Sequence, residues 1–298
     1  MSTRFSLSAL FRCVALGALG GVPLAFIACS SFSAANDPVV SSTPEGGSPD
    51  APAGTDSSIG ADADAVVVEA AGPSAYRAAV LNDAPLAYWR MGIASGLIVP
   101  DETGNNNPLL LQGAGVTLGV AGATPSDGDT AISFDGLTGS AVADNARAFD
   151  FSAKAPFTLE CWARYTPLVG GGGAYPTLFA AVEGYNATAN GYLLYVIKTY
   201  NILQLDYAGG AVASTPLTTG PPQWTHYAVT HDGTSINLYV GGTLKKTSPP
   251  TGANTARASS FTIGARGTSE YFPGGIDEVA VYTRALSVGE FVAHISAR

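Results

Sequence analysis

Short apolar runs bounded by turn residues follow one another from residue 76 to the C-terminus. In the run 157–164, FTLECWAR, alternate positions from Phe157 to Ala163 share one face of a strand and the others share the opposite face. The pairs Asp-Gly at 232–233 and Gly-Gly at 241–242 supply the positive φ angles of tight hairpins. The best strand candidates are 86–91, 130–134, 157–165, 177–182, 191–198, 202–207, 224–231, 235–240, 259–264 and 275–282. The pattern predicts an all-β domain of two packed antiparallel sheets.

A helical pattern is expected only at the C-terminal end. Ser287 is suited to be an N-cap, and Glu290 completes the spacing of a capping box. Phe291 and Ile295 follow on one helical face, four residues apart. One short C-terminal helix is therefore predicted.

The first 28 residues have the character of an export signal. Arg4 and Arg12 precede an apolar stretch from residue 14 to residue 27, and no acidic residue is present. The end of the signal, FIAC, resembles the bacterial lipobox, in which cleavage leaves the cysteine as a lipid-modified N-terminus. This resemblance implies lipidation of Cys29 and an exported, membrane-anchored bacterial lipoprotein, with the outer membrane or cell surface as the expected location. Cleavage at 33–35, Ser-Ala-Ala, is the competing interpretation.

Residues 29–75 are expected to form the lipidated cysteine and a disordered linker. Ser, Pro, Gly, Ala and Asp dominate this segment, which has too few large apolar side chains to offset the entropy of ordering. Residues 76–298 are then the folded domain. A strand within 65–70 is the alternative for the end of the linker.

Charge and cysteine content narrow the possible partners. Residues 76–298 carry 12 basic and 16 acidic side chains without a Lys/Arg stripe, which argues against nucleic acid as a partner. Of the three cysteines, Cys13 is in the signal and Cys29 is the lipidation candidate. Cys161 then has no partner for a disulfide, and it is expected in the core.

The order of several motifs resembles the laminin-G-like, concanavalin-A-like jelly-roll domains of bacterial surface proteins. The motifs are YRAAVLNDAPLAYWRMG, DETGNNNP, TAISFDG, FTLECWARY, WTHYAVTHDG, INLYVGG, FTIGA and GGIDEVAVYTRALSVGEFVAHI. The resemblance implies a two-sheet antiparallel jelly-roll sandwich. Members of this family bind glycans, bind proteins or serve as accessory modules beside enzymes, so the resemblance implies the fold more firmly than the task.

No catalytic residues are expected. Consecutive side chains of a strand point to opposite faces, so Asp277 and Glu278 are predicted to face away from each other. A glycosidase needs two carboxyl groups on either side of one bond. Related sandwich glycosidases carry Glu-x-Asp-x-Glu on one strand face, a run that is absent here. The histidines form no recognisable catalytic set, and the residue spacing of a zinc site is missing.

The same resemblance implies a possible calcium site at the rim of the sandwich. Its candidate ligands are Asp101, Asn105 and Asn107 of DETGNNNP together with Asp277. The alternative is that these polar residues cap a turn and hold the N-terminal loop against the last strand. Asn106 stands where the family commonly has Gly.

Aromatic residues are the candidates for contacts with sugar rings. Trp162, Tyr185 and Tyr271 are predicted ligand-binding residues, with packing in the core as the alternative. The loops 168–176, 183–190 and 265–273 are where recognition would occur. The favoured function is an envelope-tethered, non-catalytic module that binds a glycan or a surface protein. A structural or adhesion protein without a small ligand, and a polysaccharide hydrolase or lyase with an unrecognised site, remain the alternatives.

Overall fold

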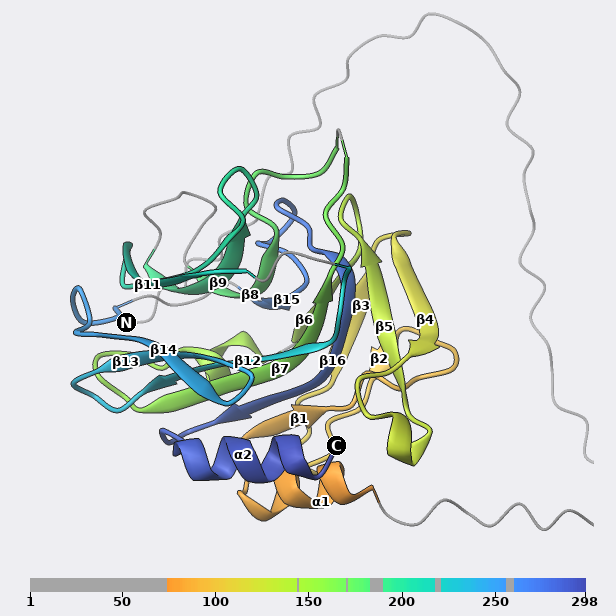
Figure 1. Ribbon diagram of the computed structural model, residues 1–298, viewed down its shortest axis with the longest axis horizontal. Helices are drawn as coiled ribbons and strands as arrows, with labels where there is room; N and C mark the ends of the chain where they lie inside the picture. The colour runs from red at the N-terminus through yellow and green to blue at the C-terminus, as the bar shows by residue number, and fades with distance from the viewer. Residues whose placement is uncertain (1–73, 144, 170, 183–189, 218–220, 256–259) are drawn as a thin grey trace, which may run out of the picture. The chain divides into compact units, whose positions relative to one another are not determined.

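Two antiparallel sheets packed face to face form the domain (Figure 1). The computed structural model describes residues 74–298 except 144, 170, 183–189, 218–220 and 256–259. Sheet A has the order β14 (Thr243–Ser248), β13 (Ile236–Val240), β12 (Thr225–His231), β7 (Phe157–Tyr165), β16 (Pro273–Tyr282), β5 (Thr130–Asp135) and β4 (Val116–Ala121), and β1 (Ala87–Trp89) also pairs with β16. Sheet B has the order β11 (Gly210–Pro216), β10 (Ile202–Tyr207), β9 (Gly191–Ile197), β8 (Thr177–Val182), β15 (Phe261–Ile263), β6 (Ser140–Ala143), β3 (Leu109–Gln112) and β2 (Ile98–Val99).

The predicted all-β jelly-roll sandwich is confirmed, and each of the ten predicted strands is present within two residues of its expected ends. The hairpins at 232–233 and 241–242 join β12 to β13 and β13 to β14. Six strands were not predicted: β2, β3, β4, β6, β11 and β14. They are short or lie at sheet edges, and β14 is almost wholly exposed, so that apolar alternation is weak in them.

Alternation places the inner residues of both sheets in one core. Phe157, Leu159 and Cys161 of β7 point inward, as predicted, and Cys161 is buried with a free thiol. Trp89 and Phe261 stack in this core with ring centroids 5.9 Å apart. Burial of so much apolar area is the main stabilising contribution in the domain, which has no disulfide among the described residues.

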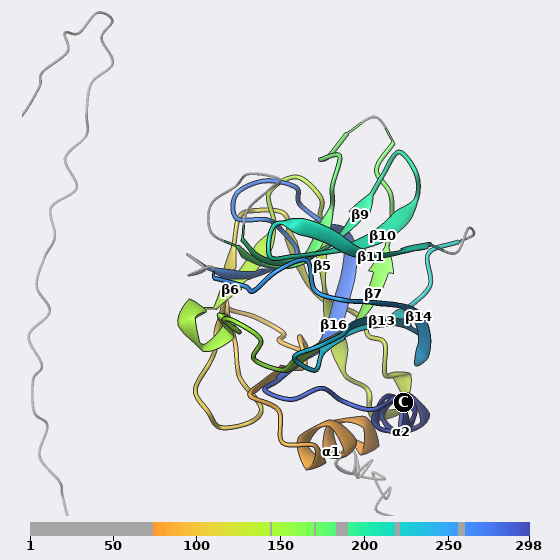
Figure 2. The same ribbon diagram turned by 90° about the vertical axis from the view of Figure 1, so that its left-hand side faces the viewer.

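Two helices cover the outward face of sheet A, where they lie side by side (Figures 1 and 2). α2 (Val288–Ser296) begins with the predicted capping box, since Ser287 and Glu290 bond reciprocally. α1 (Ala75–Asn82) was not predicted, and Ser74 caps it by accepting a bond from the backbone N–H of Arg77. No helix in the described part of the chain has the length and apolar character needed to cross a membrane.

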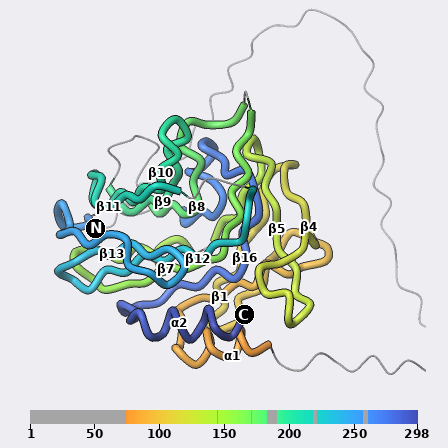
Figure 3. Tube along the Cα trace, in the orientation of Figure 1, coloured from red at the N-terminus to blue at the C-terminus, as the bar shows by residue number. Residues whose placement is uncertain are grey.

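Residues from the two ends of the described domain, Tyr76 and Arg298, both contact the side chain of Trp162. The guanidinium of Arg298 lies 4.5 Å from the ring centre of Trp162, and the Tyr76 hydroxyl accepts a bond from its indole nitrogen. Figure 3 shows the C-terminal end beside the start of α1. Short 3-10 helices at Pro125–Asp127 and Ala146–Phe149 complete the elements.

Candidate functional site

Two of the predicted recognition loops lie against each other at one end of the sandwich. The loop between β7 and β8 and the loop between β15 and β16 meet at Glu270. A carboxylate oxygen of Glu270 accepts a hydrogen bond from the backbone N–H of Tyr175 at 2.7 Å. The backbone carbonyl of Glu270 accepts one from the N–H of Thr177 at 3.0 Å. The third predicted loop, 183–190, lies outside the described residues apart from Asn190. The first two loops form a joint surface that local sequence patterns did not reveal.

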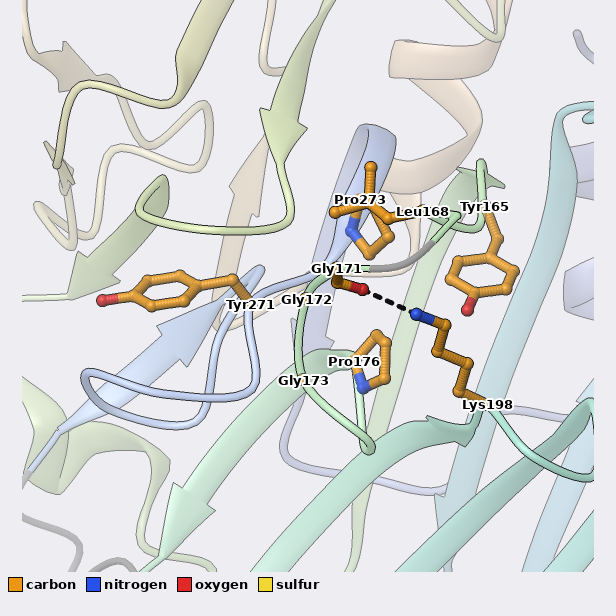
Figure 4. Close-up of a pocket in the computed structure, with 9 residues that line it drawn as sticks. All are labelled: Tyr165, Leu168, Gly171, Gly172, Gly173, Pro176, Lys198, Tyr271 and Pro273. Carbon is orange, nitrogen blue, oxygen red and sulfur yellow. Dashed lines mark hydrogen bonds between the residues drawn. The ribbon is translucent and has the colours of Figure 1, made fainter.

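A shallow depression opens between these loops (Figure 4). It is lined by Tyr165, Leu168, Gly171, Gly172, Gly173, Pro176, Lys198, Tyr271 and Pro273. The Lys198 ammonium donates to the carbonyl of Gly171 at 2.6 Å. The buried hydroxyl oxygen of Tyr165 has no hydrogen-bond partner, and Figure 4 shows it directed toward Lys198.

Beside the depression, polar side chains lie on the outward face of β9 and β10. The amide of Gln204 donates to the Tyr195 hydroxyl at 2.5 Å and to Asp206 at 2.9 Å. The Tyr195 hydroxyl also donates to Asp206 at 3.2 Å. Burial raises the pKa of Asp206, although the hydrogen bonds and the charge of Arg266 oppose this shift. The half-buried carboxylate retains an accepting capacity that a ligand hydroxyl could use.

An exposed aromatic ring lies next to this polar group. Tyr175 is 41% exposed, and its ring packs edge-on against Tyr195 with centroids 5.8 Å apart. The edge-on contact fixes the ring, so that its position is set before any ligand arrives. The nearby Arg266 has a buried Nε atom without a hydrogen-bond partner. We call Tyr175, Tyr195, Gln204, Asp206 and Arg266 the β9–β10 surface.

The predicted ligand-binding aromatics occupy different places. Trp162 is only 4% exposed, because Arg298 lies over its ring and Tyr76 and His226 pack on its edges. It therefore does not offer the exposed ring face that a sugar platform requires. Tyr271 lines the depression, but Figure 4 shows its ring pointing away from Lys198. Tyr185 lies outside the described residues.

The predicted calcium ligands do not form a common oxygen cage. Both Asp101 oxygens accept bonds inside the loop, from groups that include the N–H of Thr103 and the N–H of Asn107. The side-chain amides of Asn105 and Asn107 both donate to the carbonyl of Leu86 at 3.0 and 3.3 Å. These contacts match the alternative of a capped turn, because they hold the loop to Leu86, whose backbone N–H donates to the carbonyl of Val281 in the last strand.

Asp277 belongs to a different cluster, where it lies with Glu278 and Asp129. Ligand atoms of the three carboxylates are all within 4.8 Å of one another. The prediction that Asp277 and Glu278 face apart is wrong because β16 contains a bulge, in which Glu278 and Val279 together oppose Cys161 of β7. Glu278 has a φ of 48°, which turns its side chain to the same outward side as Asp277.

A sequence signal for this bulge exists. Ile276, Val279 and Val281 all point into the core, with spacings of three and two residues. A regular strand cannot place positions three apart on one face, so the apolar spacing itself indicates an inserted residue.

Burial raises the pKa of both Asp277 and Glu278, that of Glu278 to about 7.

A second buried network, which sequence reasoning missed, lies under the two helices. Glu160 of β7 accepts from His226 Nε2 at 2.9 Å and from the Tyr282 hydroxyl at 2.6 Å, and its Oε1 lies 3.0 Å from His294 Nδ1. The other nitrogen of His294 lies 3.0 Å from Asp83 at the end of α1. Burial opposes ionisation of Glu160, but the bonds from the histidines outweigh it and lower its pKa to about 2. Because Glu160 and both histidine rings are buried, the network joins helices to sheet and presents no cleft.

The chain was compared with known proteins. The model of a family described as the concanavalin A-like lectin/glucanases superfamily matches residues 134–291, more than half of the chain. No match was found among curated protein sequences.

Several solved structures share the fold at low identity. Domain 4 of an extracellular arabinanase from Geobacillus stearothermophilus, solved with arabinotriose, aligns with a TM-score of 0.53 and 17% identity over 71% of this chain and 98% of that domain. Trypanosoma rangeli sialidase in complex with sialic acid aligns with a TM-score of 0.52 and 20% identity. The alignment covers 70% of this chain and 32% of the sialidase. The binding domain of Paraclostridial Mosquitocidal Protein 1 aligns with a TM-score of 0.55 and 19% identity. The alignment covers 72% of this chain and 52% of that chain. The chain thus spans about a third of the sialidase, and at these identities the likeness shows the fold alone.

Proposed function

Because the chain belongs to the concanavalin A-like lectin/glucanases superfamily, we propose that it is a non-catalytic glycan-binding module. The proposed binding surface consists of the β9–β10 surface and the depression beside it. The observation that carries the proposal is the exposed ring of Tyr175 next to the hydrogen-bonded pair Gln204 and Asp206.

The chemistry of this surface suits a sugar. A pyranose or furanose ring has an apolar face of C–H groups that can pack on an aromatic ring, and its hydroxyls need partners that both donate and accept. Tyr175 supplies the ring, the Asp206 carboxylate and the Gln204 amide oxygen can accept, and Arg266 adds a positive charge nearby. α1 and α2 cover much of the outward face of sheet A (Figure 2).

The solved structures with this fold are consistent with such a ligand. One of them was solved with arabinotriose and another with sialic acid. Those ligands belong to the named proteins, and they support only the choice of glycans as the class to test first.

The arrangement of acidic residues supports a non-catalytic role. Asp277, Glu278 and Glu160 have no exposed surface, and each is engaged by neighbouring donors. Glycoside hydrolysis requires two carboxyl groups on opposite sides of a bond in an accessible site. A binding role makes no such demand.

The proposal includes export and a lipid anchor at Cys29, which rest on the sequence pattern because residues 1–73 lie outside the described part. A lipid-modified cysteine followed by a long polar segment would hold the domain at a distance from the membrane. A glycan or a protein of the cell envelope would then be within reach.

A glycan array probed with the full chain tests the proposal. We expect binding to a subset of oligosaccharides, weakened about three- to tenfold or more in Tyr175→Ala and Asp206→Asn. Tyr200→Ala is the matched control, since Tyr200 is 72% exposed in the turn between β9 and β10. Absence of any bound glycan, or equal losses in all three variants, would refute the proposal. Release of reducing sugars from a polysaccharide panel would instead favour the hydrolase, and retention of an envelope protein alone would favour the adhesion protein.

A further inference from the structure

Arg90 lies beside the acidic cluster described above and contacts two of its three carboxylates, those of Asp129 and Glu278. One guanidinium nitrogen, Nη2, is 2.6 Å from Asp127 Oδ2 and 2.9 Å from Asp129 Oδ2. The Nε atom is 3.4 Å from Glu278 Oε1. The contact with Asp129 is an ion pair without the alignment of a hydrogen bond. One guanidinium therefore faces three carboxylates that come from two distant parts of the chain.

The remaining carboxylate oxygens face N–H and O–H donors. Asp277 accepts the backbone N–H of Ala123 at 2.6 Å and that of Glu278 at 3.0 Å. Glu278 accepts from the hydroxyls of Tyr88 and Thr124. The carboxylates of Asp277 and Glu278 thus have N–H and O–H partners within the chain itself.

The spacing of the oxygens is nevertheless that of a divalent-cation site. Oxygens bound to one calcium ion lie about 2.3–2.6 Å from it, and hence up to about 5 Å from each other. Ligand atoms of Asp129, Asp277 and Glu278 fall within 4.8 Å of one another. Carboxylates so close together and so deeply buried are costly unless a positive charge lies beside them or a proton neutralises one of them. In this chain a guanidinium is already there.

We propose that Arg90 takes the place of a divalent cation in this cluster, so that the domain folds without calcium. The sequence-based expectation of calcium at Asp277 is thereby replaced by an internal ion-pair cluster. The inference concerns folding, and it stands whether or not the domain binds a glycan.

Two local features fit this role of Arg90. A Cβ atom on Gly92 would lie 1.8 Å from a carboxylate oxygen of Asp129, so the glycine leaves the space that this carboxylate occupies. A cavity of about 220 Å³ borders Arg90, Glu102 and Asp129. Solvent ions thus have a path to the cluster once the guanidinium is removed.

Thermal unfolding of the full chain in calcium chloride and in EDTA tests the inference, together with calorimetric titration of calcium alone. The variants are Arg90→Gln and Arg77→Gln. The second is the matched control, because Arg77 is more exposed and pairs only with Glu102, at 2.7 Å. A double variant, Arg90→Gln with Glu278→Gln, removes one negative charge along with the guanidinium.

We expect the natural chain to unfold at the same temperature in calcium and in EDTA. Arg90→Gln should unfold about 10 °C lower in EDTA and recover part of that loss in calcium, whereas Arg77→Gln should show neither effect. The double variant should be more stable in EDTA than Arg90→Gln. If Arg90→Gln does not fold, the test rests on the unfolding temperatures of the natural chain and of the double variant in calcium and in EDTA. Calcium binding or stabilisation in the natural chain overturns the inference, as does a calcium response of Arg90→Gln no larger than that of Arg77→Gln.

Discussion

Asp277 and Glu278 are consecutive in the chain, yet their carboxylates lie on the same side of β16, with ligand atoms within 4.8 Å of each other. The positive φ of Glu278 and the bulge opposite Cys161 make this possible. The geometry gathers buried charge that regular alternation would separate. Its consequences are best measured as stability, since the group is closed to solvent.

Folding stability is expected to be highest on the acid side of neutrality. The folded-state pKa of Glu160 is about 2, below its unfolded value, so its contribution is present above about pH 4.5 and is lost as pH falls toward 2. Burial opposes protonation of His294, but Glu160 and Asp83 raise its pKa, so its contribution is lost as pH rises through that value. Urea unfolding at a series of pH values should show stability that falls below about pH 4.5, where Glu160 loses its contribution, and falls again as pH rises toward neutrality. A maximum above neutrality would contradict this assignment.

Glu278→Gln should flatten the neutral side of that profile. Burial raises the pKa of Glu278 to about 7, so the natural chain loses stability as pH rises from about 4.5 to about 7, because the carboxyl ionises in the unfolded chain over this interval while it stays protonated in the folded one. Gln keeps an oxygen for the Tyr88 hydroxyl and cannot ionise. The difference in unfolding free energy between variant and natural chain should therefore change with pH in this interval. A constant difference would show that Glu278 does not titrate there.

Glu160→Gln should be strongly destabilising, by about 3–5 kcal/mol at pH 6. The substitution leaves His294 and His226 buried without the negative charge that they face. Glu102→Gln is the matched control, because Glu102 is partly exposed and pairs with Arg77, so about 1 kcal/mol or less is expected. Chemical denaturation of the two variants measures the contrast. Similar losses in both would mean that the buried network contributes little.

Trp162→Phe should lower stability by about 1–2 kcal/mol without weakening glycan binding. The indole N–H donates to Tyr76 at 3.0 Å, and Phe cannot replace that bond. The ring is covered, so it contacts no ligand at the proposed surface. Chemical denaturation measures the loss of stability, and a glycan array probed with the same preparation measures binding. Loss of binding at unchanged stability would restore Trp162 as a sugar platform.

Cys29→Ser should abolish membrane association if the lipid anchor is present. Acylation supplies the anchor in this proposal, and a single hydroxyl cannot be lipidated in the same way. Mass spectrometry of the mature N-terminus and membrane fractionation in a bacterial host provide the measurements. Cleavage near 33–35 in the natural chain would instead indicate an ordinary secreted protein.

Much of the fold could be predicted because local patterns specify it. The alternation through Phe157, Leu159 and Cys161 predicted both the strand and its buried face, and Ser287 with Glu290 predicted the start of α2. Edge strands such as β14 and the short helix α1 were missed. The side chains of β14 are almost all exposed, so it leaves little apolar alternation, whereas α1 carries a signal that was overlooked, since Ser74 precedes Tyr76 and Val80 at helical spacing.

The candidate site was much less accessible to sequence reasoning. The loops around 168–176 and 265–273 were expected to matter, but nothing local showed that Tyr175 and Glu270 meet. The pairing of Tyr195 with Gln204 and Asp206 depends on the register of β9 and β10. Trp162 was expected to be exposed, and only the packing of α1 and α2 reveals that it is covered.

The sequence by itself determined the two-sheet sandwich, the family and the faces of regular strands such as β7, because alternation and turn chemistry act between residues close in the chain. Only the tertiary structure decided which charges meet. Arg90 reaches Asp127, Asp129 and Glu278, and Glu160 reaches His226 and His294, across separations of up to 188 residues. Such contacts follow from strand order and from one bulge, where a single additional residue redirects a side chain. That is why the carboxylates of Asp129 and Glu278 lie beside a guanidinium that no local pattern in the sequence indicates.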